Sequence, residues 1–405
     1  MQTRRGLLMV GGLAAVTARI AWAANAEPLP IGALFPFSGN LSLLGDESFR
    51  GLDLATDERN AAGGLLGRPV RLLRADVSEQ AQATAEAKRL IGEAKAVALF
   101  GTTASALALT ASAAAELAGV PYFELDASAD PITDRGFKYL FRSCPLASAC
   151  AALSLDALTD VLAPLWQVHP SAPKLAILHE DSLYGTTVAS EQEKGCHDRH
   201  LNLAERLAYT VATLDFGPIA QHLRGAGVEV VLHTGYVNDI VLFHRAMKQA
   251  GWRPRMVIGA GAGYALNDTA AALGQDFDGV MNADLTQYRV AEAFAPGVDG
   301  VAAAYQRKYG APPRSGRSLA AYAGARLFYD ALQRAGETDK EKLRAAVLAT
   351  DLPERTLPTG WGARFDDKGQ NRRARPLLMQ WQGGSAVTVW PREAAVAAPI
   401  GTLGH

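Results

Sequence analysis

Short apolar runs alternate with helix-like stretches along most of the chain, and this alternation leaves few folds open. The runs have the nearly continuous apolar character of strands buried on both faces of a parallel sheet. They cover residues 30–36, 68–77, 96–102, 120–125, 174–181, 228–236, 255–261 and 279–285. Helical patterns lie between them, such as residues 49–56, followed by the Gly63-Gly64 stop, and the Ala-rich run 104–118. The repeated alternation predicts an α/β fold with doubly wound parallel sheets.

The pattern restarts after a helical break at residues 147–161, which predicts a second sheet rather than one very wide sheet. A length of 405 residues also exceeds one ordinary domain, so two lobes are expected. The composition, 49% hydrophobic and 20% charged, suits a soluble globular protein with a sizeable core. The formal net charge of −1 gives no reason to expect nucleic acid or an anionic membrane as a partner.

The first 26 residues have the pattern of a twin-arginine secretory signal. Arg4 and Arg5 precede an apolar run at 6–18, and two small-x-small sites end at Ala23 and Ala26. The alternatives are a membrane helix or a disordered tail, but the run is shorter than the roughly 20 apolar residues that a spanning helix needs. We expect export to the periplasm, with cleavage near Ala23 or Ala26.

Export to an oxidising compartment raises the question of disulfides among the three cysteines. Cys144 and Cys150 are close enough in sequence to pair, which would leave Cys196 alone. The favoured alternative is three incidental thiols. No Cys-x-x-Cys pair of the kind found in zinc sites is present.

The glycine-rich segment 255–268, RMVIGAGAGYALND, follows an apolar run as a nucleotide-binding turn would. A dinucleotide fingerprint needs glycine at its first and third positions and glycine or alanine at its sixth. Counted from Gly259 the sixth residue is Tyr264, and counted from Gly261 it is Leu266, so both frames fail. Asp284 stands where a ribose partner would, but the motif comes too late in the chain. The glycines instead predict a close approach of backbone or a tight turn.

Catalytic and metal-binding motifs are missing from the sequence. His197 and His200 have the spacing of one helix face, but no set of carboxylate ligands accompanies them, so a solvated pair is the favoured interpretation. There is no Gly-x-Ser-x-Gly elbow, His-Glu-x-x-His pair or phosphate-binding lysine loop. We expect no enzyme, no metal and no cofactor.

Ligands of doubly wound folds bind beyond the carboxyl ends of the strands, so the turns there are the candidate site. Thr103 and Ser105 follow one strand where a helix begins, and Ser128 follows the next strand. These hydroxyls could simply cap helices, but helix N-termini also offer free N–H groups to an anion. Tyr184 and Tyr236 follow two later strands and could line a cleft, with core packing as the alternative.

Residues 31–76 resemble the opening of the branched-chain amino acid and amide class of periplasmic substrate-binding proteins. The features that carry this likeness are the Ile31-Gly32 strand, Ser38-Gly39, Gly45, Asn60, the Gly63-Gly64 stop, Gly67 and Asp76. The likeness continues through ASADPIT (127–133), HEDSLYG (179–185), HTGYVND (233–239), MKQAGW (247–252) and FDDKGQN (365–371). It covers nearly all of the chain after residue 26.

The resemblance implies the type I periplasmic-binding-protein fold, in which two α/β lobes with doubly wound parallel sheets are joined by three crossings. The N-terminal lobe would hold residues 27–143 and 284–373, and the C-terminal lobe residues 144–283 and 374–405. The ligand contacts implied by the family fall on Leu44, Thr103, Ala104, Ser105, Ala127, Ser128, Ala129, Tyr184 and Tyr236, with Gly261 at the position of a further contact.

The implied function is the capture of a small organic acid, amide or amino-acid-like ligand for an ABC importer, with a permease in the inner membrane as the protein partner. We expect a monomer. The alternatives are a periplasmic sensor that presents its closed form to a signalling receptor and, less favoured, an exported enzyme.

The glycine turn is where this sequence departs from the family pattern. Amino-acid binders of the family place an acidic residue against the ligand ammonium, and Gly261 stands at that position. A buried ammonium without such a partner would be costly. The departure predicts a carboxylate or amide ligand without a free α-amine. Two tyrosines at the site and the space beside Gly261 suit an aromatic one.

Overall fold

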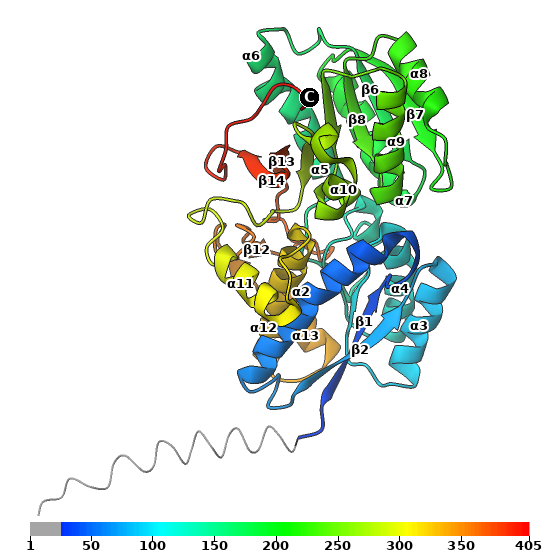
Figure 1. Ribbon diagram of the computed structural model, residues 1–405. Coiled ribbons are helices and arrows are strands. Elements are labelled where there is room, and N and C mark those ends of the chain that lie inside the picture. The colour runs from blue at the N-terminus through cyan, green and yellow to red at the C-terminus, as the bar shows by residue number, and fades with distance from the viewer. Residues whose placement is uncertain (1–25, 405) are drawn as a thin grey trace, which may run out of the picture.

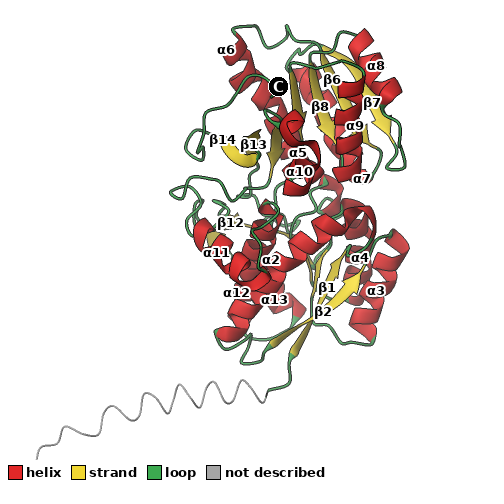
Figure 2. Ribbon diagram, in the orientation of Figure 1, coloured by secondary structure: helices red, strands yellow, loops and turns green. Residues whose placement is uncertain are grey.

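The computed structural model describes residues 26–404. The predicted signal segment, residues 1–26, therefore lies outside the described residues except for its last one. The described chain forms two stacked lobes, each with its own sheet (Figure 1). Helices flank both sheets (Figure 2), as the strand–helix alternation predicts. The α/β class and the two lobes are confirmed.

The sheet of the first lobe has five strands, all parallel, in the order β2-β1-β3-β4-β5. The strands are β1 (Leu29–Phe35), β2 (Val70–Asp76), β3 (Leu99–Gly101), β4 (Tyr122–Glu124) and β5 (Leu140–Arg142). The helices that follow the first three of these strands are α2 (Ser42–Ala61), α3 (Gln80–Gly92) and α4 (Ser105–Ala118). Because β3 and β4 are adjacent and parallel, the turns that follow them meet at one edge of the sheet.

The chain returns to this lobe after it has built most of the second one. The returning elements are α11 (Val298–Tyr309), α12 (Gly316–Ala335), α13 (Lys340–Leu348), β11 (Asp351–Leu352) and β12 (Ala363–Arg364). Helix α12 runs alongside α2 (Figure 1). Its Phe328 stacks on Phe123 of β4, with ring centroids 4.1 Å apart, so one core joins early and late parts of the chain.

The sheet of the second lobe has seven strands in the order β14-β13-β10-β9-β8-β6-β7. They are β6 (Leu175–Glu180), β7 (Leu203–Tyr209), β8 (Val230–Thr234), β9 (Met256–Gly259), β10 (Met281–Asp284), β13 (Leu377–Gln382) and β14 (Ser385–Trp390). Strands β6 to β10 are parallel, but β13 pairs antiparallel with β10 and β14 antiparallel with β13. The second sheet is therefore mixed rather than wholly parallel. The tight β13–β14 turn uses Gly383 and Gly384, which both have positive φ.

The helices of the second lobe are α5 (Ala147–Asp156), α6 (Ala163–Trp166), α7 (Leu183–Asp198), α8 (Gly217–Gly225), α9 (Val237–Gln249) and α10 (Asn267–Leu273). With the π-helical turn Ala157–Leu162, α5 and α6 form one helical segment. By length and composition this segment could cross a membrane, the single helix of residues 26–404 that could. Its Leu155, Leu158 and Leu162 are buried in the core of the lobe, which identifies a core helix.

Elements on either side of each predicted lobe boundary belong to different lobes. Strand β5 of the first sheet is followed by α5, and β10 of the second sheet is followed by α11 of the first lobe. The third change falls between β12 and β13. The exact boundaries at 143/144, 283/284 and 373/374 stay predictions. Cys144, Cys150 and Cys196 are buried free thiols, in agreement with the prediction of three incidental thiols rather than a Cys144–Cys150 disulfide.

Candidate ligand-binding site

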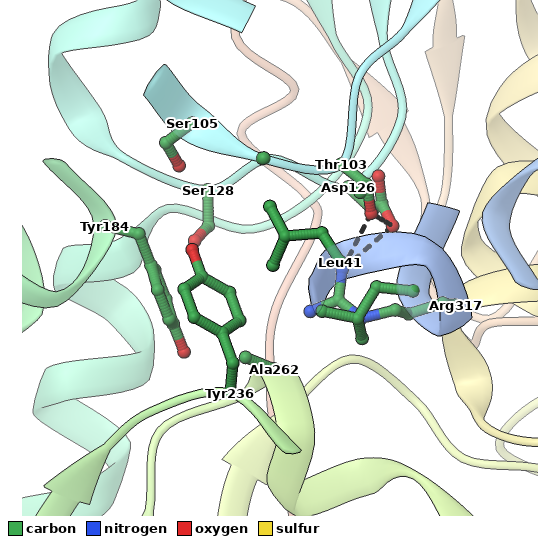
Figure 3. Close-up of a pocket in the computed structure, with 11 residues that line it drawn as sticks. Leu41, Thr103, Ser105, Asp126, Ser128, Tyr184, Tyr236, Ala262 and Arg317 are labelled. Atoms are coloured by element: carbon green, nitrogen blue, oxygen red, sulfur yellow. Dashed lines mark hydrogen bonds and ion pairs between the residues drawn. The ribbon is translucent and has the colours of Figure 1, made fainter. Parts of the chain in front are cut away.

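A small pocket lies between the lobes. Both lobes line it (Figure 3). From the first lobe come Leu41, Leu44, Thr103, Ala104, Ser105, Asp126, Ser128 and Arg317, and from the second lobe come Tyr184, Tyr236 and Ala262. The turns after β3 and β4 thus face the turns after β6, β8 and β9, as expected for ligand sites in parallel sheets.

The N-terminus of α4 opens into this pocket without a side-chain cap. Ala104 is the N-cap residue and has extended backbone, so the amides of the first turn have no capping oxygen from it. The hydroxyl of Ser105 accepts a hydrogen bond from the Ala129 amide at 3.2 Å, which leaves its own hydrogen free to donate. Thr103, just before the cap, has a φ of +71°, a conformation that is uncommon outside glycine and asparagine. This corner of the pocket offers donors to an anion.

Glu124, the last residue of β4, holds the two first-lobe turns together. Its carboxylate accepts hydrogen bonds from the Thr102 amide at 2.8 Å and the Ala127 amide at 2.9 Å. Burial, together with the nearby Asp126 carboxylate, raises the pKa of Glu124 to about 8. The residue lies behind the pocket and orients the turns that carry Thr103 and Ser128.

A buried ion pair forms the opposite wall of the pocket. The Arg317 Nη1 lies 2.9 Å from Asp126 Oδ2, and the two side chains are 8% and 0% exposed. Ser48 and Thr103 each donate a hydroxyl hydrogen bond of 2.5 Å to the same Asp126 oxygen. Asp126 Oδ1 and Arg317 Nε are buried without a hydrogen-bond partner among the described residues. Figure 3 shows this pair across the pocket from Ser105 and Ser128.

The start of α12 is fixed by Glu47 of α2, and this positions Arg317. Glu47 accepts a hydrogen bond of 2.5 Å from the Ser318 hydroxyl and one of 2.7 Å from Tyr305. It also accepts from the Arg314 amide at 3.1 Å. Burial raises the pKa of this carboxyl. The neighbours of Arg317 are thereby attached to the helix that carries Ser48.

Residues 28–385 match the family model described as "Periplasmic binding protein". The chain belongs to this family. It is similar to the Leu/Ile/Val-binding protein homolog 8 of Brucella suis biovar 1 (strain 1330), with 43% identity over 392 residues, 96% of this chain and 97% of the relative.

Two solved structures show the same fold at lower identity. The branched-chain amino acid transporter substrate-binding protein LivJ of Streptococcus pneumoniae, in complex with isoleucine, has 22% identity and a TM-score of 0.77, covering 92% of this chain and 100% of its own. An ABC transporter solute-binding protein of R. palustris, in complex with 4-hydroxybenzoate, has 22% identity and a TM-score of 0.76. The match covers 89% of this chain and 95% of the solved one.

Membership makes this chain a periplasmic binding protein of the branched-chain amino acid ABC transporter type. Proteins of this kind bind small molecules and deliver them to an ABC permease. The relatives are substrate-binding proteins of transporters rather than enzymes. Their periplasmic location agrees with the predicted export.

The binding protein brings most of its predicted contact residues together. Leu44, Thr103, Ala104, Ser105, Ser128, Tyr184 and Tyr236 line the pocket. Ala127 and Ala129 are buried behind it, where their carbonyls accept hydrogen bonds from the fully buried Arg142. Gly261 is next to Ala262, which does line it. That these residues contact a ligand stays a prediction.

The tyrosines of the second lobe cover the side of the pocket opposite α4. Their ring centroids lie 6.0 Å apart, with the planes tilted by 43°. The Tyr184 hydroxyl donates to the carbonyl of Ala260, so its oxygen can still accept a hydrogen bond. Burial raises the pKa of Tyr184 well above its usual range and keeps the phenol neutral. The pair presents a flat, largely apolar wall.

The glycine turn approaches its neighbours closely, as predicted. A Cβ on Gly263 would lie 2.6 Å from the Val237 nitrogen, and one on Gly259 would lie 2.4 Å from Tyr264 Cγ. Gly261 has a φ of +89°, and its amide donates to Asn282 Oδ1 at 2.7 Å. Backbone contact rather than nucleotide binding therefore accounts for these glycines.

Proposed function

We propose that this binding protein captures a small carboxylate or amide ligand between its lobes and delivers it to an ABC permease in the inner membrane. The observation that supports this most strongly is the uncapped N-terminus of α4 at the pocket, next to hydroxyls of Ser105 and Ser128. Helix N-termini stabilise carboxylates through free amides and the helix dipole. No hydrogen bond within the described residues occupies the Ser128 side chain.

The ligands named for two relatives of the same fold support the carboxylate. Isoleucine and 4-hydroxybenzoate differ in shape and in the presence of an amine, but both carry a carboxylate. In our proposal the mature chain is a periplasmic monomer, and the permease recognises the form in which Tyr184 and Tyr236 have closed on the ligand.

A thermal-shift screen of the mature chain, residues 27–405, tests the proposal. The compounds are amino acids, aliphatic acids and aromatic acids. The methyl ester of each compound is the matched control, because it lacks the negative charge of the carboxylate. We expect a subset of the acids to raise the melting temperature. A ligand that binds only the native state, at a concentration about 100 times its Kd, raises the free energy of unfolding by about 2.7 kcal/mol. Calorimetry then gives the affinities.

Two results would overturn the proposal. One is equal stabilisation by the esters, which removes the anion site. The other is the absence of binding across the screen together with unchanged uptake of the same compounds by cells that lack the gene.

A further inference from the structure

Tyr236 lines the pocket (Figure 3), and its backbone is held by a carboxylate of the helix that it begins. It is the N-cap residue of α9, and its amide donates a hydrogen bond of 2.9 Å to Asp239 Oδ2. The same oxygen accepts a hydrogen bond of 2.8 Å from the Tyr209 hydroxyl. Tyr209 is buried and is the last residue of β7, the edge strand of the sheet. Asp239 therefore joins the start of α9 to the end of β7.

The hydrogen bonds continue from Tyr209 to the glycine turn. The Tyr209 hydroxyl oxygen lies 2.9 Å from Nε2 of His233, a residue of β8. The other ring nitrogen of His233, Nδ1, lies 2.6 Å from the Tyr264 hydroxyl. His233 and Tyr264 are fully buried. Because β6 separates β7 from β8 in the sheet, the contact between Tyr209 and His233 spans a whole strand.

The protons along this chain of hydrogen bonds have one consistent arrangement. The ionised Asp239 carboxylate only accepts, so Tyr209 uses its single hydrogen there, and the Thr234 carbonyl at 3.3 Å is the more distant acceptor. The Tyr209 oxygen then accepts from the Nε2–H of His233, which leaves Nδ1 to accept from the Tyr264 hydroxyl. Burial lowers the pKa of His233 well below its usual range, so the ring keeps this neutral form.

Tyr264 gives the chain of hydrogen bonds a fixed end in the core of the second lobe. Its ring stacks on Phe277, with centroids 5.8 Å apart and the planes tilted by 13°. Its carbonyl accepts a hydrogen bond of 2.7 Å from the Trp381 indole. Tyr264 belongs to the turn Ala262–Ala265, whose first residue lines the pocket. The chain thus links the two pocket turns that follow β8 and β9.

Packing alone would not require hydroxyls on Tyr209 and Tyr264, because phenylalanine would fill the same space. Buried polar groups whose hydrogen bonds are all satisfied fix the groups that they join in one arrangement. Here the group at the pocket end is Tyr236. A wall that is already fixed in the free protein loses less conformational freedom when a ligand binds.

We propose that Tyr209 and His233 are positioning residues for ligand binding, which act through Asp239 to fix Tyr236 at the pocket. The inference rests on the proposed function, which supplies the ligand that Tyr236 meets. Tyr209 and His233 themselves do not line the pocket.

Tyr209→Phe tests the proposal, because it removes one hydroxyl and keeps the ring. Calorimetry with L-isoleucine, 4-hydroxybenzoate and every other acid that binds in the thermal-shift screen should show affinity about fivefold weaker, as for one lost hydrogen bond. Tyr329→Phe is the matched control. Tyr209 and Tyr329 are 5% and 1% exposed, and the Tyr329 hydroxyl lies 2.7 Å from that of Thr56 in the first lobe. Tyr329→Phe should lower the melting temperature by a similar amount and leave the affinity unchanged.

A double-mutant cycle with Tyr236→Leu separates positioning from a general loss of stability. If Tyr209 acts through Tyr236, Tyr209→Phe should change the affinity of the Tyr236→Leu protein by less than about twofold. Wild-type affinity in Tyr209→Phe overturns the inference. The same fivefold weakening in the Tyr236→Leu background also overturns it, because Tyr209 would then act by another route.

Amide exchange measured by NMR in the ligand-free protein gives a second readout, which decides if Tyr236→Leu binds too weakly for the cycle. Tyr209→Phe should speed exchange of the Tyr236 amide about fivefold. Tyr264→Phe, which removes a different bond of the same chain, should also speed it and carries the tests if Tyr209→Phe does not fold. Tyr329→Phe should leave the rate unchanged. A Tyr236 amide that exchanges at the wild-type rate in both variants overturns the inference and leaves the proposed function standing. If no acid of the screen binds the wild-type protein, the proposed function itself fails.

Discussion

Ser128 is the residue whose loss best tests the anion end of the pocket. It follows β4 and lines the pocket together with Ala104 and Ser105 at the α4 N-terminus (Figure 3). Ser128→Ala should weaken binding of an acid found in the screen by about 1 to 3 kcal/mol, the range for a lost hydrogen bond to a charged group. Calorimetry measures this.

Ser148→Ala is the matched control, because the Ser148 hydroxyl donates to Asp130 at 2.5 Å and does not line the pocket. It should leave the affinity unchanged. An unchanged affinity in Ser128→Ala as well would remove Ser128 from the site.

Residues of the site could be predicted where they follow a strand. Thr103, Ser105 and Ser128 were found because a turn after a parallel strand, followed by a helix start, is visible in the sequence. Arg317 could not be found in this way, since it lies 191 positions from its partner Asp126 and in the first turn of a helix that does not follow a strand of either sheet.

Helix α9 carries a histidine that makes stability depend on pH. His244 is 4% exposed, packs against Tyr264 and Phe277, and its Nε2 has no hydrogen-bond partner within the described residues. Burial lowers the pKa of His244 to about 3. The unfolded chain, with its ordinary histidine pKa near 6.5, binds a proton that the folded chain excludes, so stability is lost as pH falls below that value.

His244→Phe should remove this loss. Between pH 7.5 and 5.0 the wild-type free energy of unfolding should fall by about 2 kcal/mol more than that of the variant. Urea denaturation at the two pH values measures this difference. The contributions of the other titrating groups are the same in both proteins and cancel. His197→Phe, at a side chain 89% exposed, should behave as wild type. Identical pH dependence in all three proteins would show that His244 is protonated in the folded state.

Elements were predictable where burial on both faces makes a strand continuously apolar. Strands β6, β8 and β9 are fully buried and were found. Strand β7 was missed because it lies at the sheet edge, where every residue of its LAERLAY sequence except Tyr209 is half-buried or exposed and the strand is not continuously apolar. The β13–β14 hairpin was missed although its Gly-Gly pair between apolar runs is a recognisable turn pattern. Strand β5 was missed because its three residues, Leu-Phe-Arg, end in a charged residue and do not form an apolar run.

At the scale of the whole molecule, we expect the two lobes to close on the ligand as hinged bodies. Tyr184 and Tyr236 belong to the second lobe, whereas the donors of α4 belong to the first, so a ligand that contacts both must hold the lobes together. Small-angle scattering should show a smaller radius of gyration when an acid from the screen saturates the protein. Its non-binding ester should leave the profile unchanged. The same profile with and without a tightly bound acid would indicate a rigid, preformed pocket.

The late return of α12 to the first lobe has a consequence for synthesis on the ribosome. Phe328 completes the aromatic core around Phe123, and Arg317 neutralises Asp126, yet both are translated only after nearly the whole second lobe. The first lobe therefore cannot finish folding as an independent unit while the chain emerges. Its exposed core must wait for the residues of α12, Gly316–Ala335, and a nascent chain in that state is prone to aggregation.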